Sequence, residues 1–266
     1  MVGKDTAKLL QFLAGSRCRV TILSELCENG SLHRTDFDRI LDTARTTITR
    51  NLDALINHDL VERQSRTYYL TLQGEFIASE LADLVEIIQA TDKLKPILEQ
   101  LSVSEIEFDP LLLAEGTVTV SSSSNPYAPV NQHIGRMGSA HHVKCLLPSL
   151  GFNPLRAAER GLLDSGAKHE LVVDTDVAET FRSNPEYTEP LNHLLDTGIL
   201  TLYVSDEEIP YYLGVLDDTV QIGVSDEGIP RALLETKSDD VKEQAVDILN
   251  NYIDKSKQIN KLSSVG

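Results

Sequence analysis

The chain has 266 residues, with 24 basic and 41 acidic side chains and a formal net charge of −17 at pH 7. This length suffices for one or two domains with full hydrophobic cores. No stretch reaches the ~18–20 apolar residues of a membrane-spanning helix, and the polar N-terminus is unlike a signal peptide. The three cysteines show no CxxC spacing, which indicates reduced thiols. We therefore expect a cytoplasmic protein without a membrane partner.

The charge is unevenly distributed along the chain. Residues 1–71 hold 10 of the basic and 9 of the acidic side chains, which leaves 14 and 32 for the remainder. An acidic balance normally argues against a nucleic-acid partner, but the acidic surplus lies outside the first 71 residues. The surplus, the eleven lysines and the lack of tryptophan also fit the protein of a halophile. In molar salt the screening length falls to about 3 Å, so a distant acidic domain would not repel DNA bound elsewhere.

Helix signals open the chain. The stretch "KDTAKLLQFLAGS" predicts a short helix that ends at Gly15. Ser16 can cap a second helix, which Gly30 ends. Thr35 is expected to cap a third, short helix.

A fourth helix is predicted from Asp42 or Thr43, either of which can cap it, to about His58. Its inward stripe is expected to hold Ala44, Ile48, Leu52 and Leu55. The other sides carry hydroxyls and arginines, which can donate to phosphates and to base edges. The residues of this helix predicted to contact DNA are Arg45, Thr46, Thr47, Thr49 and Arg50.

Two β-rich runs around Gln64–Ser65 predict a hairpin after this helix. Helices followed by a hairpin are the order of a winged helix, in which the last helix enters the major groove and the hairpin touches the backbone beside it. The predicted contacts on the hairpin are Arg63, Arg66, Thr67 and Tyr68. We therefore expect a winged helix-turn-helix DNA-binding domain over residues 1–72, with double-stranded DNA as its partner.

A long helix is expected next, capped by Thr71. Its residues Ile77, Leu81, Leu84 and Ile88 follow a heptad-like spacing, which predicts that the helix over 73–90 helps to pair two subunits. It would form part of a connecting segment over 73–103. Pro96 is expected to interrupt or restart it.

From residue 104 onward short β-rich runs alternate with helical runs and then form a strand meander. This pattern predicts an α/β domain with a mixed sheet over 104–266, and an α+β fold for the whole chain. The predicted strands are 117–121, 142–147, 170–174, 200–204, 211–216, 219–224 and 232–236. The predicted helices are 130–137, 153–165, 175–182, 186–196 and 239–257.

Two stretches resemble a known family. Residues 16–75, with "SRCRVTILSELCENGSLHRTDF" and "TARTTITRNLDALINHDLVERQSRTYYLTLQGE", resemble the winged-helix domain of archaeal transcriptional regulators. The segment "YYLGVLDDTVQIGVSDEGIPRALLETKSDDVKEQAVDILNNYI" resembles the end of the effector domain of the archaeal methanogenesis-and-filament regulator family, which is frequent in haloarchaea. The resemblance implies a dimeric, ligand-responsive transcription factor, and it leaves the effector open.

A binding pocket is predicted where "TVTVSSSSNPYAPVNQHIGRMGS" runs from a strand into a helix, because ligands of α/β sheets favour such strand ends. The alternative is a plain flexible loop. The residues predicted to bind a small-molecule effector are Ser121, Ser122, Ser123, Asn125, Tyr127, His133 and Arg136.

No catalytic residue, cofactor or metal ligand is predicted. A nucleophile elbow, a P-loop and an HExxH motif are absent, and the histidines at 133, 141, 169 and 193 show no metal spacing. His142-x-Lys144 resembles the HxK pair of phospholipase-D enzymes, but Ser149 occupies the position of their Asp.

These features together predict a homodimeric, ligand-responsive DNA-binding transcriptional regulator rather than an enzyme. One alternative is an adaptor that uses the winged helix to bind another protein. The other is a phospholipase-D-like enzyme.

Overall fold

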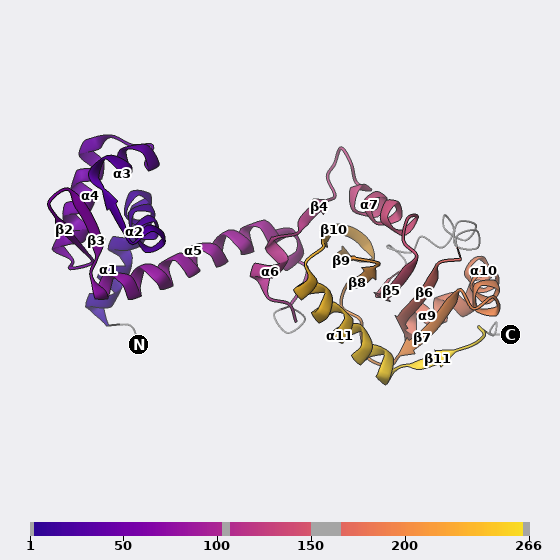
Figure 1. Cartoon of the computed structure of the whole chain (residues 1–266). Helices are drawn as coiled ribbons and strands as arrows, with labels where there is room; N and C mark the ends of the chain where they lie inside the picture. Colours follow the sequence, from indigo (N-terminus) through magenta and orange to yellow (C-terminus); the bar gives the residue numbers. More distant parts are fainter. Residues whose placement is uncertain (1–2, 103–106, 150–165, 263–266) are drawn as a thin grey trace. The chain divides into compact units, whose positions relative to one another are not determined.

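The computed structural model describes residues 3–102, 107–149 and 166–262 (Figure 1). The chain divides into two compact units, Met1–Ile88 and Gln89–Gly266. The first unit has one apolar core, and the second has two apolar clusters.

The first unit is a winged helix. Its elements in chain order are α1 (Lys4–Ala14), α2 (Arg17–Asn29), β1 (Ser31–His33), α3 (Arg34–Ile40), α4 (Arg45–Asn57), β2 (Val61–Gln64) and β3 (Thr67–Leu70). The three strands form an antiparallel sheet in the order β1-β3-β2. The helices and the hairpin predicted from the sequence are confirmed, as are Ser16 and Gly30 at the two ends of α2. Strand β1 was not predicted, because three residues are too short to show a periodic pattern.

Two predicted helix starts are wrong. The cap of α3 is His33 rather than Thr35, and Asp36 accepts a hydrogen bond of 2.9 Å from the His33 backbone N–H. Helix α4 starts after Ala44, which is exposed and therefore lies outside the inward stripe. A turn in which the Thr43 N–H donates to the Leu41 carbonyl (2.8 Å) keeps Asp42 and Thr43 out of the capping position.

The core of the first unit forms around the inward side of α4. Ile48, Leu52 and Leu55 are fully buried there, at the i, i+4, i+7 spacing of a helix face. They pack with apolar residues of α1, α2, α3 and the wing. Burial of each such side chain contributes about 1.5–3 kcal/mol, so this stripe determines which side of α4 faces solvent.

A buried amide joins α4 to α2 and, through Arg19, to α1. Asn51 is 4% exposed, and its Oδ1 accepts hydrogen bonds from Arg19 Nη1 (3.0 Å) and Ser16 Oγ (3.2 Å). Its Nδ2 donates to the Thr47 carbonyl (2.8 Å). Arg19 in turn donates from Nε to the Phe12 carbonyl (2.7 Å), and its guanidinium lies 4.2 Å from the centre of the Phe12 ring. Asn51 and Arg19 therefore link α1, α2 and α4 through satisfied polar contacts.

Helix α5 (Leu72–Leu98) starts as predicted, with the Gly74 N–H donating to Thr71 Oγ1 at 3.0 Å. Pro96 lies inside the last turn, so the prediction that it interrupts the helix is wrong. A proline removes one helical hydrogen bond, and a helix can continue past it. The predicted heptad-like positions divide into two kinds: Ile77 and Leu81 pack partly against the core of the first unit, whereas Leu84 and Ile88 are each 50% exposed.

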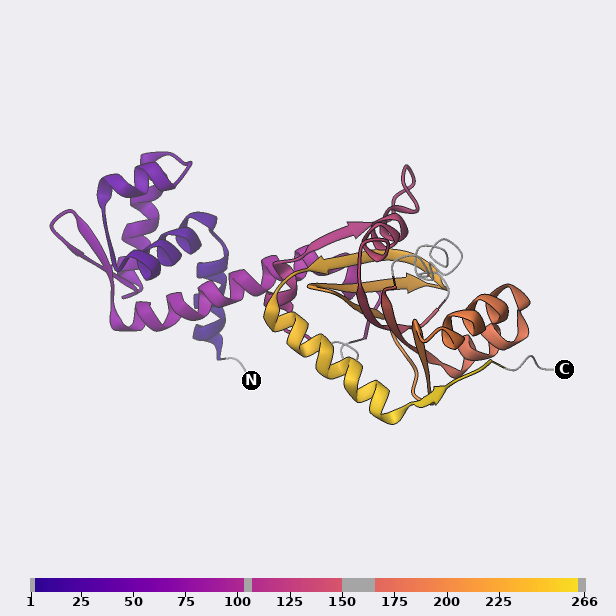
Figure 2. The same cartoon turned by 45° about the vertical axis from the view of Figure 1, so that its right-hand side comes forward.

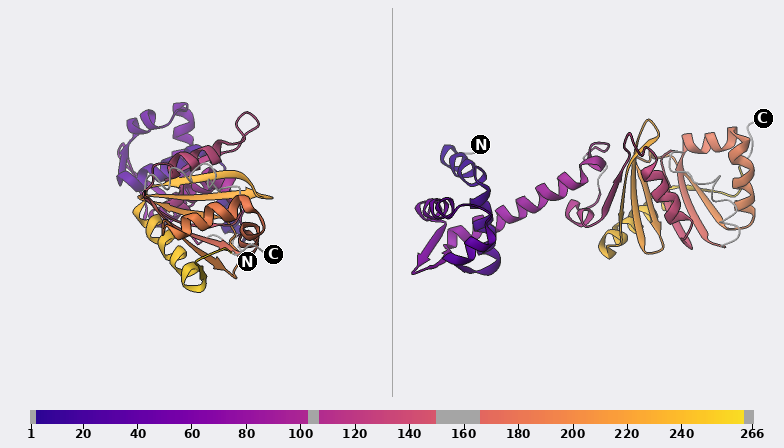
Figure 3. Two further views of the ribbon diagram at one scale, coloured as in Figure 1. Left: turned by 90° about the vertical axis from the view of Figure 1, so that its right-hand side faces the viewer. Right: turned by 90° about the horizontal axis from the view of Figure 1, so that it is seen from above.

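The second unit is built on one mixed sheet of eight strands. The strands are β4 (Thr117–Val120), β5 (His142–Leu147), β6 (Lys168–Asp174), β7 (Leu200–Ser205), β8 (Tyr212–Leu216), β9 (Thr219–Asp226), β10 (Ile229–Thr236) and β11 (Lys257–Ile259). Their order is β11-β7-β6-β5-β8-β9-β10-β4. The pairs β5–β6 and β6–β7 are parallel, and the other pairs are antiparallel. Figure 3 shows the twist of this sheet.

Helices cover both faces of the sheet (Figure 2). They are α6 (Pro110–Ala114), α7 (Ala128–Met137), α9 (Thr175–Ser183), α10 (Pro185–Asp196) and α11 (Asp239–Lys255). Side chains alternate along each strand: Cys145 and Leu147 join the cluster under α7, α9 and α10, and Leu146 joins the cluster under α11 and the end of α5. The α+β fold with a mixed sheet is therefore confirmed.

The elements predicted for the second unit agree with the structure with three exceptions. Helix α6 and strand β11 were not predicted, since both are very short. The helix predicted over 153–165 lies outside the described residues.

The buried amide of Asn51 leads to a stability prediction. Asn51→Ala leaves Arg19 and Ser16 without their shared acceptor, so we expect the N-terminal unit to lose about 1–3 kcal/mol of unfolding free energy. Urea unfolding of the full chain measures this loss. The matched control is Asn57→Ala on the exposed side of the same helix, which we expect to change stability by less than about 0.5 kcal/mol. Equal midpoints for the two variants would contradict a structural role for Asn51.

Candidate nucleic-acid interface

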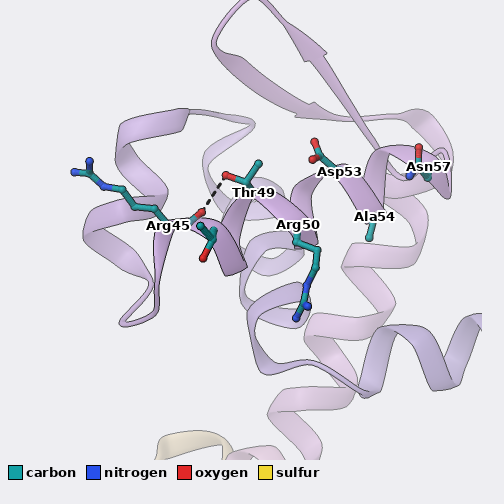
Figure 4. A pocket seen from close by; sticks show the side chains of 7 residues that line it. Arg45, Thr49, Arg50, Asp53, Ala54 and Asn57 are labelled. Atoms are coloured by element: carbon teal, nitrogen blue, oxygen red, sulfur yellow. Dashed lines mark hydrogen bonds between the residues drawn. The ribbon is translucent and has the colours of Figure 1, made fainter.

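The outward side of α4 carries an open groove of about 570 Å³ (Figure 4). It is lined by Arg45, Thr46, Thr49, Arg50, Asp53, Ala54 and Asn57. At 100° per residue, four of these side chains, Thr46, Arg50, Asp53 and Asn57, fall within an arc of about 60° opposite the buried stripe. The groove is thus a row of polar side chains along a helix whose other side is fixed in the core.

Of the residues predicted on α4, Arg50 and Thr46 lie at the centre of this row. Both are exposed, and Arg50 forms no ion pair with any described residue within 4.0 Å. Thr47 lies at the flank of the row and is half-buried. Its backbone carbonyl accepts a hydrogen bond from Asn51 Nδ2. The structure therefore brings most of the predicted residues together and leaves Thr47 at the margin.

Arg45 and Thr49 are held by a network between α3 and α4. Asp38 forms ion pairs with Arg34 Nη1 (2.8 Å) and with Arg45 Nε (3.3 Å). The Thr49 hydroxyl donates to the Arg45 carbonyl (3.0 Å) and accepts from Arg34 Nη2 (3.3 Å). These contacts fix the first turn of α4 against α3. The Arg45 side chain is nevertheless 84% exposed and remains accessible.

The N-terminus of α4 lies at one end of the groove. Its N-cap, Ala44, provides no side-chain cap, so the first backbone N–H groups are open to an external acceptor. The positive end of a helix dipole favours an anion such as a phosphate at this place.

The β2–β3 hairpin lies beside α4 (Figure 1). Arg66 is exposed and has no ion-pair partner in the described part of the chain, and Thr67 is half-buried. Arg63 is exposed, with Nε donating to the Ser65 carbonyl (2.8 Å). A backbone hydrogen bond from the Arg34 N–H to the Arg66 carbonyl (2.9 Å) ties the hairpin to the start of α3.

Tyr68 does not fit its predicted role. It is 4% exposed, its ring meets that of Phe37 edge-on with centroids 5.7 Å apart, and the Arg63 guanidinium lies 6.0 Å from its centre. Alternation along β3 turns Tyr68 into the core. A hairpin tyrosine was therefore mistaken for a surface residue.

The sequence prediction missed Asp53 and Asn57. Both line the groove, and both lie on the same side of α4 as Thr46 and Arg50. The spacing 46, 50, 53, 57 is itself the signal that could have found them. They were overlooked because the prediction selected arginines and hydroxyls only.

The predicted effector residues fall into two groups. Ser122, Ser123, Asn125 and Tyr127 are exposed, and the loop closes on itself through the Asn125 N–H and Ser122 Oγ (3.1 Å). Ser121 is half-buried and continues strand β4 with a hydrogen bond to the Arg231 carbonyl (2.8 Å). His133 and Arg136 instead belong to α7 and contact the sheet.

A polar cluster lies between α7 and the sheet. His133 is 1% exposed, and its Nδ1 lies 2.8 Å from Oε1 of the buried Gln221. Gln221 donates from Nε2 to Glu235 (2.9 Å), and Arg136 forms an ion pair with the same carboxylate. Burial alone would raise the pKa of Glu235, but the hydrogen bonds from Arg136 and Gln221 outweigh it and lower that pKa. The hydrogen bond to Glu235 also raises the pKa of Arg136, so both groups stay charged.

The His142-x-Lys144 pair lies on β5 at a pocket of about 400 Å³. Lys144 is held by Glu170 (3.6 Å) and by Asn250 Oδ1 (3.0 Å), and His142 lies 3.8 Å from Asp217. This is an ion-paired sheet surface without a nucleophile–base pair. Among the described residues no group of three His, Cys, Asp or Glu side chains could hold a metal ion, and no described helix is long and apolar enough to span a membrane.

Comparison with solved structures yields distant likenesses. The archaeal chromatin protein TrmBL2 matches 89% of this chain and 91% of its own at 14% identity and a TM-score of 0.43. The phospholipase D family member Nuc from Salmonella typhimurium and NucT from Helicobacter pylori each match 54% of this chain and 98% of their own, at 14% and 15% identity and TM-scores of 0.43. Since these TM-scores lie below 0.5, the function proposed below does not rest on them. No curated protein matches the sequence.

Two family models match successive parts of the chain. The HVO_A0261 N-terminal domain matches residues 8–93, and the middle domain of the methanogenesis regulatory protein FilR1 matches residues 126–255. The second match agrees with the prediction of a regulator rather than an enzyme. The chain thus carries, in this order, a segment similar to the HVO_A0261 N-terminal domain and a segment similar to the FilR1 middle domain.

Proposed function

We propose that the protein is a sequence-specific transcriptional regulator that inserts α4 into the major groove of double-stranded DNA. The observation that carries this proposal is the polar outward row of α4, in which the exposed Arg50 has no ion-pair partner among the described residues. The major groove is wide enough to admit an α-helix. The match of residues 126–255 to the middle domain of the methanogenesis regulatory protein FilR1 supports the same function.

The side chains of the row suit the edges of bases. Arginine donates two hydrogen bonds to guanine O6 and N7, which makes Arg50 the strongest candidate for a base contact. Thr46 offers a hydroxyl and a methyl group to a phosphate or a thymine methyl. Because the Thr49 hydroxyl is already engaged with Arg34 and Arg45, Thr49 has mainly its methyl group to offer.

The surroundings of the row suit the DNA backbone. The open N-terminus of α4 can receive one phosphate, and the exposed Arg63 and Arg66 of the wing can neutralise others. Tyr68 takes no part, since its ring is in the core. We thus assign DNA contacts to Arg45, Thr46, Thr49, Arg50, Arg63, Arg66 and Thr67, with Thr47 at the margin.

The decisive experiment is recovery of the DNA bound in cells, followed by gel shift on the recovered site at two salt concentrations. A regulator of this kind binds the recovered site more tightly than random DNA, and its affinity falls as salt rises. Equal affinity for both duplexes would refute sequence-specific binding. Binding to a protein without any bound DNA would instead favour the adaptor.

Two variants separate base contacts from backbone contacts. Arg50→Ala is expected to weaken specific binding by about 1–3 kcal/mol, because it removes a base contact. Arg66→Ala is expected to weaken binding to all sequences alike and to reduce the slope of affinity against salt by about one. Titrations of the recovered site and a scrambled site, at several salt concentrations, measure both effects. Negligible effects in both variants would mean that α4 and the wing are ordinary surface.

We further propose that two copies pair through α5. Leu84 and Ile88 are each 50% exposed on this helix and lie four residues apart, and exposed apolar residues at this spacing favour a partner helix. The two winged-helix units of such a dimer would bind half-sites ~34 Å apart or at multiples of this distance. Leu84→Glu is expected to shift sedimentation from dimer to monomer, whereas Glu86→Gln on the same helix leaves it unchanged. A monomeric wild-type protein would rule the pairing out.

We also propose that the second unit binds a small-molecule effector. We place the candidate effector site at the Arg136–Glu235 ion pair rather than along the whole Ser121–Tyr127 loop. Arg136 retains 33% side-chain exposure, so a ligand carboxylate could compete with Glu235 for it. A melting-temperature screen of anionic metabolites, run with wild type and Arg136→Gln, tests this site. If no compound shifts the wild type, or if the variant responds equally, the site is not an effector site.

A further inference from the structure

The groove on α4 contains one side chain that general DNA affinity does not explain. Asp53 is exposed on the groove and lies in the same row as Arg50. A carboxylate on a surface that approaches phosphates adds electrostatic repulsion. Asp53 therefore weakens unspecific binding to DNA, and a favourable contact in the specific complex would offset this repulsion.

Asp53 is not neutralised within the protein. It forms no ion pair with any described residue within 4.0 Å, and Figure 4 shows its carboxylate directed away from the Arg50 guanidinium. Asp38, another acid of this unit, behaves differently, because Arg34 and Arg45 both pair with it. A carboxylate whose role was to orient Arg50 would point toward it, so this role is excluded for Asp53.

The spacing of Arg50 and Asp53 along α4 suits contacts to two neighbouring base pairs. Three residues along an α-helix correspond to a rise of about 4.5 Å, close to the ~3.4 Å between neighbouring base pairs. When Arg50 meets one base pair, Asp53 lies over the adjacent one. Asp53 also lies within the 60° arc of α4 opposite the buried stripe, and not at the flank of that arc.

A carboxylate can only accept hydrogen bonds, which restricts the base that it meets. In the major groove cytosine presents the N4 amino donor alone. Adenine presents the N6 donor with the N7 acceptor beside it, and thymine and guanine present acceptors at this place. An acceptor opposite Asp53 leaves the carboxylate without a partner and adds repulsion, which is a strong means of rejecting wrong sites.

We infer that Asp53 is a specificity-determining residue that selects cytosine in the base pair next to the guanine bound by Arg50. This inference rests on the proposed DNA-binding function and deepens it. It predicts a half-site in which a guanine contact and a cytosine contact come from neighbouring base pairs.

The test is selection of bound duplexes from a random library with the full-length chain, followed by titration of the selected site. Wild type is expected to prefer cytosine over thymine at one position by about 10-fold, the contrast of a direct base contact. Asp53→Asn is expected to change that preference to adenine, because an amide pairs with adenine N6 and N7. Asp53→Ala is expected to lose the preference and to bind random DNA more tightly, since one negative charge is gone.

Glu28→Gln is the matched control, because Glu28 is an exposed acid of α2 outside the groove. It removes the same charge and is expected to leave the selected sequence unchanged. If Asp53→Asn and Asp53→Ala select the wild-type site with undiminished contrast, the inference is overturned and the proposed function stands. If wild type selects no sequence at all, the proposed function itself fails.

Discussion

The outward surface of α4, the proposed DNA-binding surface, depends on a buried amide. Asn51 accepts from Arg19 and Ser16 and donates to the Thr47 carbonyl, so that one side chain fixes both the rotation and the axial position of α4. The apolar stripe of Ile48, Leu52 and Leu55 sets the same rotation by burial alone. A nonpolar contact tolerates small shifts, whereas a hydrogen-bonded amide in a core does not, because each unmade bond costs free energy. A helix that reads base edges needs this positional accuracy.

The polar residues of α4 therefore do different work on its two sides. Asn51 and Thr49 are engaged within the protein, and their contacts join α4 to α1, α2 and α3. Arg50 and Asp53 are left without ion-pair partners among the described residues, and they lie in the row that faces the groove. A preorganised binding surface requires both kinds of residue: some that form hydrogen bonds within the protein and hold the helix in place, and others whose charged groups are left for a ligand.

The second unit has its own buried polar cluster, under α7. The Arg136–Glu235 ion pair, Gln221 and His133 lie between α7 and the sheet, beside an apolar cluster that includes Met137 and Leu233. Replacing a buried ion pair by apolar residues is often neutral or stabilising, so such a pair is weak evidence for stability. The Arg136–Glu235 pair joins α7 to the sheet, and the exposed Ser121–Tyr127 loop precedes α7. Among the described residues of this unit, this pair is the best-defined candidate for an effector contact. The loop serines alone form no such arrangement.

Elements with local sequence signals could be predicted before the structure was known. Such signals depend on neighbouring residues alone. They include the helix cap Ser16, the positive-φ glycine Gly30, the alternation of the long strands and the heptad-like spacing of α5. They sufficed to predict the winged helix and the mixed sheet. Local signals failed where tertiary contacts compete with them. A turn outside α4 displaced the expected cap, and the three-residue strands β1 and β11 form only through pairing with β3 and β7. The burial of Asn51 was decided in three dimensions, because Arg19 and Ser16 reach its side-chain oxygen. The positions of Tyr68 and Asp53 follow the periods of a strand and a helix, but only the packed core decides which side of β3 and of α4 faces solvent. Residue type predicts what a side chain can do, and only packing decides which neighbour it meets.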